Sequence, residues 1–276
     1  MEGLILLFKF MTRLPIPMDP KFDSIKMGKS MRFFPVVGIV IGIIMYVFYL
    51  LFGSFIRSAY ILAGVMVLLE IAITGAMHLD GLSDTFDGIF SYRSKQKMLE
   101  IMKDSRLGTN GGIAIVLYFV LKILLIAGIR DTGFGIAGEM FGLQNAAGAV
   151  VLVTPVLARI NTVLNCAAAP YARSSGSAKD FVECTDKAGV LTAAAIALIF
   201  SGVVGCGILG VLNPLHLVNI TAVTMVLGLY FAKLMERKIG GVTGDTLGAI
   251  LELSEIVILF GFYFSAAASI GSKLSF

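Results

Sequence analysis

Charged residues are scarce in this sequence. Only 14% of its 276 residues are Asp, Glu, Lys or Arg, whereas soluble domains average about 25%. Hydrophobic residues make up 57%, and the mean hydropathy is +0.91. A soluble globule of this size could not remove so much apolar surface from water. The composition therefore excludes a soluble enzyme domain, a disordered chain and a nucleic-acid binder that works through surface charge.

Cysteine is scarce as well. The three cysteines, Cys166, Cys184 and Cys206, are odd in number and form no Cys-x-x-Cys motif. This pattern argues against a disulfide framework and against a structural zinc site. We expect buried free thiols at these positions.

Long apolar runs, in contrast, are frequent. A helix needs about 20 mostly apolar residues to cross a bilayer, and seven segments approach that length. They predict an all-α, polytopic membrane bundle formed by a single domain, residues 1–276, in which the sixth span is short. The predicted spans are Phe33–Ile56, Ser58–Met77, Gly111–Ile129, Ala146–Ala169, Ala188–Leu212, Leu215–Ala232 and Leu247–Ile270.

The segments between the spans predict an orientation. The first eleven residues are too short to span and lack the basic start of a signal peptide, so we expect an interfacial helix closed by Pro15 and Pro17. With residues 1–32 inside, 17 Lys and Arg residues fall in inside segments and three in outside segments. Because these residues favour cytoplasmic loops, we expect a multi-pass protein of the inner membrane with a cytoplasmic N-terminus.

Carboxylates gather in the longest polar stretch, residues 78–88. Asp80, Asp84 and Asp87 have the spacing i, i+4, i+7, which places them within roughly 60° of one another on a helix. Three carboxylates on one stripe repel each other unless a cation lies among them, and hard oxygen ligands suit Mg²⁺. Asp104 joins them if residues 89–101 fold back. The alternative is a solvated loop whose acids pair with nearby basic residues, namely Arg93, Lys95 and Lys103.

His78 precedes this stripe and falls on the opposite helical face from Asp80. It is therefore not expected to bind the same ion. A substrate contact and a local hydrogen bond both stay open.

A second polar cluster, GGVTGDTLG at residues 240–248, opens the last span. Glycines before a helix N-terminus can cradle an anion, although a flexible helix cap looks the same. Asp245 and Glu252 are seven residues apart and so share a helix face. Carboxylates inside a span are costly and usually mark function.

Three arginines near the membrane are candidates for phosphate contacts, because Arg pairs with phosphate in a bidentate fashion. Arg159 lies inside the fourth span, where pairing with Glu70 or Glu255 is an equal alternative. Arg173 follows at the cytoplasmic end of that span. Arg13 beside the prolines is either a headgroup anchor or a phosphate ligand. Carboxylates and basic groups thus reach one predicted cytoplasmic face, as Mg²⁺-dependent chemistry on a phosphorylated substrate requires.

These motifs resemble those of the cobalamin synthase family, the adenosylcobinamide-GDP ribazoletransferases of late vitamin B12 synthesis. The matching stretches run in the family's order over nearly the whole chain: FMTRLPIP (10–17), RFFPVVG (32–38), HLDGLSDTFDG (78–88), MKDSRLGT (102–109) and GGVTGDTLGA (240–249). The chain departs from the family at Ser174–Ser177, where a Gly-Leu-Gly turn is usual.

The resemblance implies a membrane enzyme that joins adenosylcobinamide-GDP to α-ribazole or its 5′-phosphate and releases GMP. Mg²⁺ is the expected metal, and Asp80, Asp84, Asp87 and Asp104 are the expected metal-binding group. We expect Asp84 or Asp87 to take the proton of the attacking hydroxyl. The expected partners are the two substrates and the lipid bilayer, with no nucleic acid, and a homo-oligomer stays open. The residues expected to bind substrate are His78, Lys103, Arg106, Arg13, Arg159, Arg173, Thr243, Asp245 and Glu252.

Two other classes remain as alternatives. CDP-alcohol phosphotransferases and UbiA-like prenyltransferases also place spaced Asp residues at a membrane face, but their own motif spacings are missing here. A cation-coupled transporter would explain the charges inside the spans. Against it, the densest acids lie at a membrane face and no inverted repeat is visible.

Overall fold

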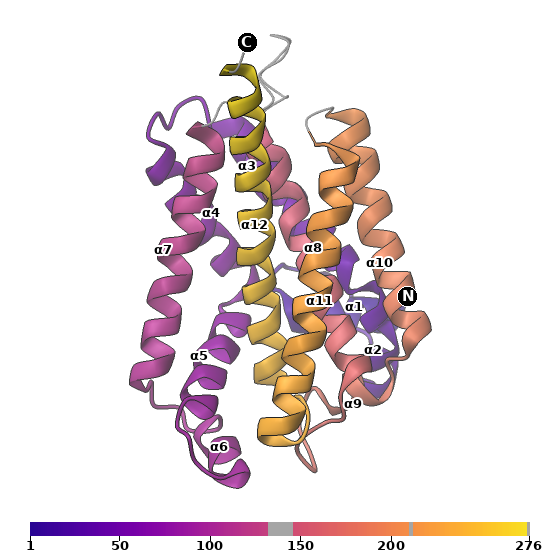
Figure 1. The fold of residues 1–276 in the computed structure, drawn as a ribbon. Coiled ribbons are helices and arrows are strands. Elements are labelled where there is room, and N and C mark those ends of the chain that lie inside the picture. Colours follow the sequence, from indigo (N-terminus) through magenta and orange to yellow (C-terminus); the bar gives the residue numbers. More distant parts are fainter. Residues whose placement is uncertain (132–145, 210–211, 275–276) are drawn as a thin grey trace.

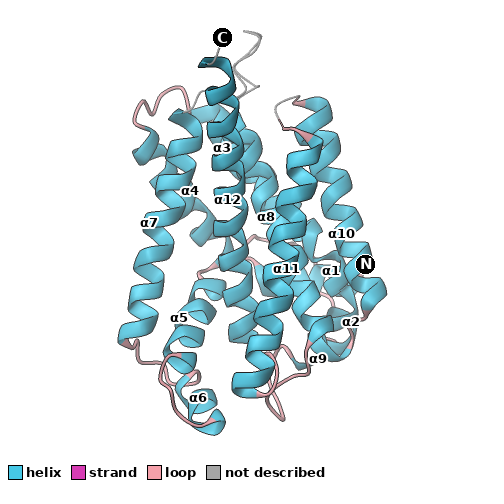
Figure 2. Cartoon of the chain, viewed as in Figure 1, coloured by secondary structure: helices cyan, strands magenta, loops and turns pink. Residues whose placement is uncertain are grey.

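The computed structural model describes residues 1–131, 146–209 and 212–274, with residues 267–274 described as backbone only. Within these ranges the chain is helical, apart from loops and one isolated parallel bridge between Tyr171 and Val242 (Figures 1 and 2). Six helices are long and apolar enough to cross a membrane, and a bent helix pair provides a seventh span if it counts as one. The predicted all-α polytopic bundle is confirmed.

The long helices run side by side along the bundle. They are α3 (Phe34–Phe52), α7 (Thr109–Asp131), α8 (Ala146–Ala168), α10 (Lys187–Ser201, continued by the π-helical η2, Gly202–Ile208), α11 (Pro214–Ile239) and α12 (Gly244–Leu274). The shorter elements are α1 (Glu2–Met11), α2 (Ser24–Lys29), the 3₁₀ turn η1 (Ser30–Phe33), α4 (Ala59–Thr74), α5 (Met77–Ile89), α6 (Lys95–Ile101) and α9 (Lys179–Glu183).

Helix α8 is the centre of the bundle. Its apolar window is entirely buried, and it packs against α3, α10, α11 and α12. Glycines allow the closest of these contacts, because a Cβ atom at Gly38 or Gly42 of α3 would lie 2.5 or 2.1 Å from a carbonyl oxygen of α8. Small residues at helix contacts let two backbones approach closely inside a membrane.

The predicted second span, Ser58–Met77, is wrong as one straight helix. Helix α4 ends at Thr74, Gly75 and Ala76 adopt left-handed φ values of 67° and 60°, and α5 leaves at an angle of 94°. Glycine readily ends a helix in this conformation. The bend directs the acidic stretch away from α4 and against α12.

Other boundaries differ at helix ends. Helix α11 extends to Ile239, so the sixth span is not short: its basic end, which includes Lys233 and Arg237, continues the helix beyond the apolar part. The first span ends at Phe52 instead of Ile56. The fifth span is confirmed as far as Ile208, where η2 ends, and residues 210 and 211 lie outside the described residues. Helix α1 confirms the predicted N-terminal helix.

All three cysteines are free thiols, as expected. Cys166 is buried. Cys184 and Cys206 are partly exposed, so the prediction of burial is wrong for these two.

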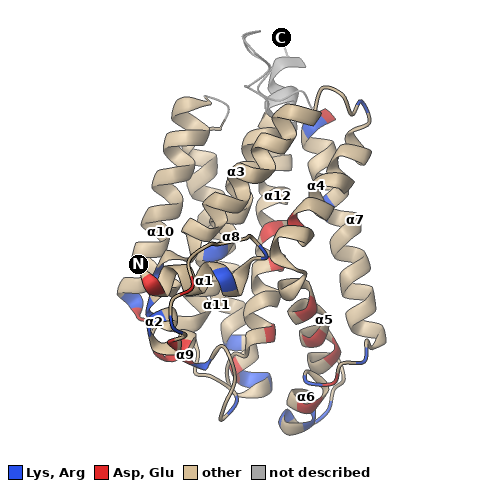
Figure 3. Ribbon diagram, turned by 180° about the vertical axis from the view of Figure 1, so that it is seen from behind, with Lys and Arg blue, Asp and Glu red and all other residues tan. Residues whose placement is uncertain are grey.

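A buried charge network ties three helices together in the interior. Lys122 of α7 donates hydrogen bonds to Glu70 of α4 (2.7 Å), to Glu255 of α12 and to the Tyr118 hydroxyl (2.6 Å). The predicted alternative that pairs Arg159 with Glu70 or Glu255 is therefore wrong, since Lys122 is their ion-pair partner. Most other charged residues gather in the half of the molecule that holds α5, α6 and α9 (Figure 3).

Candidate active site

Helix α5 and the start of α12 pack backbone to backbone. A Cβ atom at Gly81 would lie 2.7 Å from the carbonyl oxygen of Asp245, and one at Gly248 would lie 3.1 Å from the Cα atom of His78. Only glycine permits this approach. The contact brings the two polar motifs of the sequence, residues 78–88 and 240–249, into one site.

The acidic stripe lies on a helix, as its spacing predicts. Asp80 is exposed and Asp84 is half-buried, and among the described residues neither carboxylate has a hydrogen-bond or ion-pair partner. The alternative of a solvated loop with paired acids is therefore wrong. The negative charges of Asp80, Asp245 and Asp87 and the positive charge of Arg173 all act on the Asp84 carboxylate.

Asp87 has a different role from its neighbours on the stripe. Its two carboxylate oxygens accept hydrogen bonds from the backbone N–H groups of Gly108 and Gly111, each at 2.8 Å. A Cβ atom at either glycine would lie 2.4 Å from this carboxylate. Asp87 therefore caps the start of α7, where helical N–H groups lack partners within the helix.

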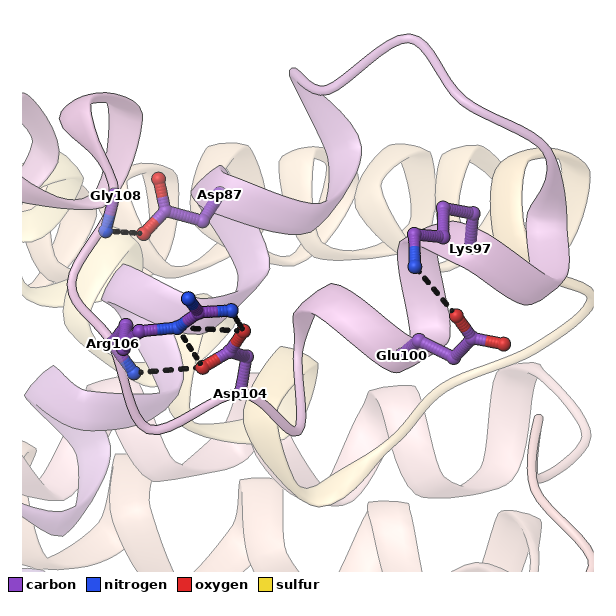
Figure 4. Close-up of polar contacts among 6 residues, drawn as sticks. All are labelled: Asp87, Lys97, Glu100, Asp104, Arg106 and Gly108. Carbon is purple, nitrogen blue, oxygen red and sulfur yellow. Dashed lines mark hydrogen bonds and ion pairs between the residues drawn. The ribbon is translucent and has the colours of Figure 1, made fainter.

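Asp104 is held by Arg106 of the same loop. The Arg106 side chain donates to the Asp104 carboxylate from Nε (2.9 and 3.1 Å), and its backbone N–H donates as well (Figure 4). These bonds hold the pKa of Asp104 at about 2. The chain does fold back, because Asp87 and Asp104 line one open groove of about 330 Å³.

The four aspartates nevertheless do not form one ligand set. Among residues 1–131, 146–209 and 212–274, no group of three or more His, Cys, Asp or Glu side chains is arranged to hold a metal ion. The reason is local: Asp87 and Asp104 already have donors of their own. Of the four, Asp80 and Asp84 have carboxylates without such partners among the described residues.

The loop before α12 is a helix cap fixed to the end of α8. The Thr243 hydroxyl accepts from the Thr246 N–H (3.3 Å) and the Thr246 hydroxyl accepts from the Thr243 N–H (2.8 Å), a reciprocal capping pair. Val242 bonds through its backbone to Pro170 and Ala172, at 2.8 and 2.9 Å. The structure therefore places Thr243 in the cap.

This pairing brings Arg173 to the start of α12. The Arg173 guanidinium donates to the Asp245 carboxylate at 2.8 Å. Asp245 also accepts from the Thr243 hydroxyl at 3.2 Å. Two predicted site residues, Arg173 and Asp245, are thus brought together as an ion pair.

A partly open cavity of about 140 Å³, the junction cavity, lies where these elements meet. Four of the five sequence motifs that carry the family resemblance contribute to its walls. The lining residues from these motifs are Phe10 and Met11, Phe34, the α5 residues His78, Asp80 and Gly81, and the α12 residues Gly244, Asp245 and Gly248. His78 is buried here, beside the ring of Phe34. Segments far apart in the sequence therefore form one cavity, and Asp80 of the acidic stripe lines it.

The structure does not bring every predicted residue to this cavity. Arg159 is fully buried behind Phe34, with its guanidinium 5.1 Å from the centre of that ring. Glu252 is buried in the bundle near Lys122. Arg13 lies against Gly75 at the bend between α4 and α5.

Two basic residues of the MKDSRLGT motif also lie away from the junction cavity. Arg106 is paired with Asp104. The Lys103 side chain is exposed, without a partner among the described residues.

The sequence analysis missed several residues of the cavity wall, among them Ser177 and Phe181. Ser177 and Phe181 line the junction cavity from the turn before α9 and from α9 itself. Ser177 belongs to the stretch where the chain departs from the family pattern. That departure is the only signal for it in the sequence, and nothing there singles out Phe181.

Comparison with known proteins decides which family uses this arrangement. The family model described as cobalamin-5-phosphate synthase matches residues 3–263. The chain belongs to the cobalamin-5-phosphate synthase family. The predicted resemblance is confirmed, and membership makes the protein a membrane transferase of cobalamin biosynthesis. It also favours this interpretation over the other transferases and over the transporter.

Curated relatives of this synthase match along nearly their whole length. A protein from Fusobacterium nucleatum subsp. nucleatum is 43% identical, over 95% of this chain and 97% of the relative. Proteins from Caldanaerobacter subterraneus and Clostridioides difficile are 37% and 38% identical, over 96% and 95% of this chain and 98% and 97% of the relatives. All three are named adenosylcobinamide-GDP ribazoletransferase. No solved structure matches the chain.

Proposed function

We propose that this synthase transfers the cobinamide phosphate of adenosylcobinamide-GDP to α-ribazole or α-ribazole 5′-phosphate. The observation that carries the proposal is the junction cavity, where four motifs of the family meet at Asp80, one helical turn from Asp84. Neither carboxylate has a partner among the described residues. The names of the curated relatives supply the substrates.

The reaction is a displacement at phosphorus. A ribazole hydroxyl oxygen forms a bond to the phosphorus attached to cobinamide, and the bond from that phosphorus to the phosphate oxygen of GMP breaks. The hydroxyl proton passes to a carboxylate, and GMP leaves with the electron pair of the broken bond. The products are adenosylcobalamin, or its phosphate, and GMP.

Asp84 is the carboxylate best suited to accept that proton. It is half-buried beside three other carboxylates, so taking up a proton relieves their mutual repulsion. Asp87 is less suited, because both of its oxygens already accept backbone hydrogen bonds.

Two free carboxylates fit Mg²⁺. This ion is usually bound through one or two carboxylates, together with waters and substrate phosphates, so a group of three protein ligands is not required. Asp80 and Asp84 lie one helical turn apart and would hold it. When bound, Mg²⁺ neutralises charge on the diphosphate and on the leaving GMP.

We place the site on the cytoplasmic side of the inner membrane. The excess of Lys and Arg in the predicted inside segments supports this orientation. The test fuses to the N-terminus either a reporter enzyme that works only in the cytoplasm or one that works only outside the inner membrane. Activity of the first reporter supports the orientation, and activity of the second contradicts it.

Product analysis tests the proposed reaction. Detergent-solubilised protein receives adenosylcobinamide-GDP, α-ribazole and Mg²⁺, and GMP and the corrinoid product are quantified. We expect equal amounts of both, and none after EDTA treatment. No product from folded protein overturns the proposal. Separate reactions with a CDP-alcohol or a prenyl diphosphate as donor test the alternative transferases.

A further inference from the structure

A second, larger cavity lies on the far side of the Arg173–Asp245 ion pair. This basic cavity has a volume of about 670 Å³ and is open to the surface. The end of α8, the turn that follows it, and α9 form its walls. The residues that give it its chemical character are Tyr171, Arg173, Ser174, Lys179 and Glu183.

Two cationic side chains of the cavity, Arg173 and Lys179, could donate hydrogen bonds to a bound anion. The buried Nε atom of Arg173 has no hydrogen-bond partner among the described residues, although its Nη2 atom bonds to Asp245. The Lys179 ammonium lies 3.7 Å from Glu183 and donates to the Ser174 carbonyl oxygen at 3.2 Å. Arginine and lysine together form charge-assisted hydrogen bonds with phosphate oxygens.

The volume of the basic cavity and the aromatic ring in its wall indicate which class of ligand it can hold. Small-molecule pockets measure about 300–1,000 Å³, so the basic cavity has room for a nucleotide and the junction cavity of about 140 Å³ does not. Tyr171 is half-buried in the wall and offers a ring against which a base can stack.

We propose that the basic cavity binds a nucleoside 5′-phosphate, with its phosphate at Arg173 and Lys179. The ion pair joins the two cavities directly, because Arg173 lines one and Asp245 lines the other. A phosphate bound at Arg173 therefore lies next to the proposed reaction. This inference rests on the proposed function, which supplies two such ligands: α-ribazole 5′-phosphate and the GMP portion of adenosylcobinamide-GDP.

The Lys179→Gln variant tests the proposal and shows which of the two ligands, α-ribazole 5′-phosphate or the GMP portion of adenosylcobinamide-GDP, binds in the basic cavity. Losing one charge-assisted bond to phosphate corresponds to about a tenfold weaker interaction. If the ligand is α-ribazole 5′-phosphate, its KM rises about tenfold while the KM of unphosphorylated α-ribazole is unchanged. If the ligand is the guanosine part, the inhibition constant of GMP rises instead.

Lys187→Gln is the matched control. Lys187 is exposed, lies eight positions further along the chain at the start of α10, and has no partner among the described residues. We expect wild-type constants for this control. Wild-type constants in Lys179→Gln overturn the proposal, as does an equal rise in the KM of α-ribazole with and without phosphate.

Direct binding separates this proposal from the proposed reaction. Calorimetry measures the binding of GMP and α-ribazole 5′-phosphate to wild-type and Lys179→Gln protein without turnover. Weaker binding to the variant supports the basic cavity even if the wild-type protein forms no product. Equal binding of both probes to the two proteins overturns it even if the transferase reaction is confirmed.

Discussion

Asp84 and Asp87 lie on the same face of α5, yet their surroundings differ. Asp84 faces other carboxylates and has no hydrogen-bond partner among the described residues, whereas Asp87 is saturated by two backbone N–H groups. The spacing of the stripe predicted both as metal ligands and bases. It could not reveal the cap, because the two donors, Gly108 and Gly111, lie more than twenty residues further along the chain.

Asp87→Asn is expected to destabilise the protein. The amide keeps one acceptor oxygen but turns an N–H donor toward a backbone N–H, so one partner of Asp87 is left unpaired. An unsatisfied buried donor costs about 1–3 kcal/mol. Thermal unfolding in detergent measures this as a lower Tm. The control is Asp80→Asn, because Asp80 is exposed and its carboxylate has no partner among the described residues, and this variant should keep the wild-type Tm. Equal Tm values for both variants contradict the capping role.

Arg106→Gln is expected to raise the pKa of Asp104 from about 2 toward its ordinary value near 3.8. Because the folded-state pKa of Asp104 is lowered, the Arg106–Asp104 pair contributes fully to the free energy of unfolding above about pH 4. This contribution disappears as the pH falls toward 2. A carboxyl-carbon NMR titration of ¹³C-labelled Asp checks the shift. Identical titration curves for wild type and variant would show that Arg106 does not hold this carboxylate.

Helix ends, more than helix centres, position the site. The start of α12 depends on the reciprocal cap of Thr243 and Thr246, and the start of α5 depends on the bend at Gly75. The i, i+4, i+7 spacing correctly predicted that α5 is a helix. The bend escaped prediction because apolar residues continue up to it and because glycine also occurs inside helices, as Gly38 and Gly42 do in α3.

Thr243→Ala is expected to weaken the start of α12. Removing a capping hydroxyl costs about 0.5–2 kcal/mol, and Asp245 also loses the hydroxyl that donates to it. Thermal unfolding should give a lower Tm, and the KM for adenosylcobinamide-GDP should rise. Thr243→Ser keeps the hydroxyl and should restore both values. If Ser behaves like Ala, the methyl group and not the cap is responsible.

The bundle as a whole is held by packing around α8 and by the charge network of Lys122. Apolar runs predicted that these helices cross the membrane, because a span is a property of one segment. They could not predict which partners meet across helices. Glu70, Lys122 and Glu255 come from three different helices, and their pairing depends on the rotation of each one. The same limit applies to the junction cavity, which draws on six α-helices.

Lys122→Met is expected to destabilise the bundle strongly. Removing one partner of a buried ion pair leaves an uncompensated charge and costs about 3–5 kcal/mol. Adding Glu255→Gln should recover part of the loss, because it removes one of the stranded carboxylates. Tm values in detergent compare the variants, with Lys187→Met at the exposed start of α10 as the control. A Tm equal to that of Lys187→Met would show that the network does not stabilise the bundle.

We propose that Asp84, beside Asp80, accepts the proton in the transfer reaction and that Asp104 is not needed for it. The most direct test is the turnover number of Asp84→Asn and Asp104→Asn at saturating Mg²⁺, normalised to folded protein. Losing a general base lowers the rate by about 10²–10⁴-fold. We expect such a loss for Asp84→Asn and near-normal turnover for Asp104→Asn. Near-normal turnover of Asp84→Asn, or an equal loss in both variants, would contradict this role of Asp84.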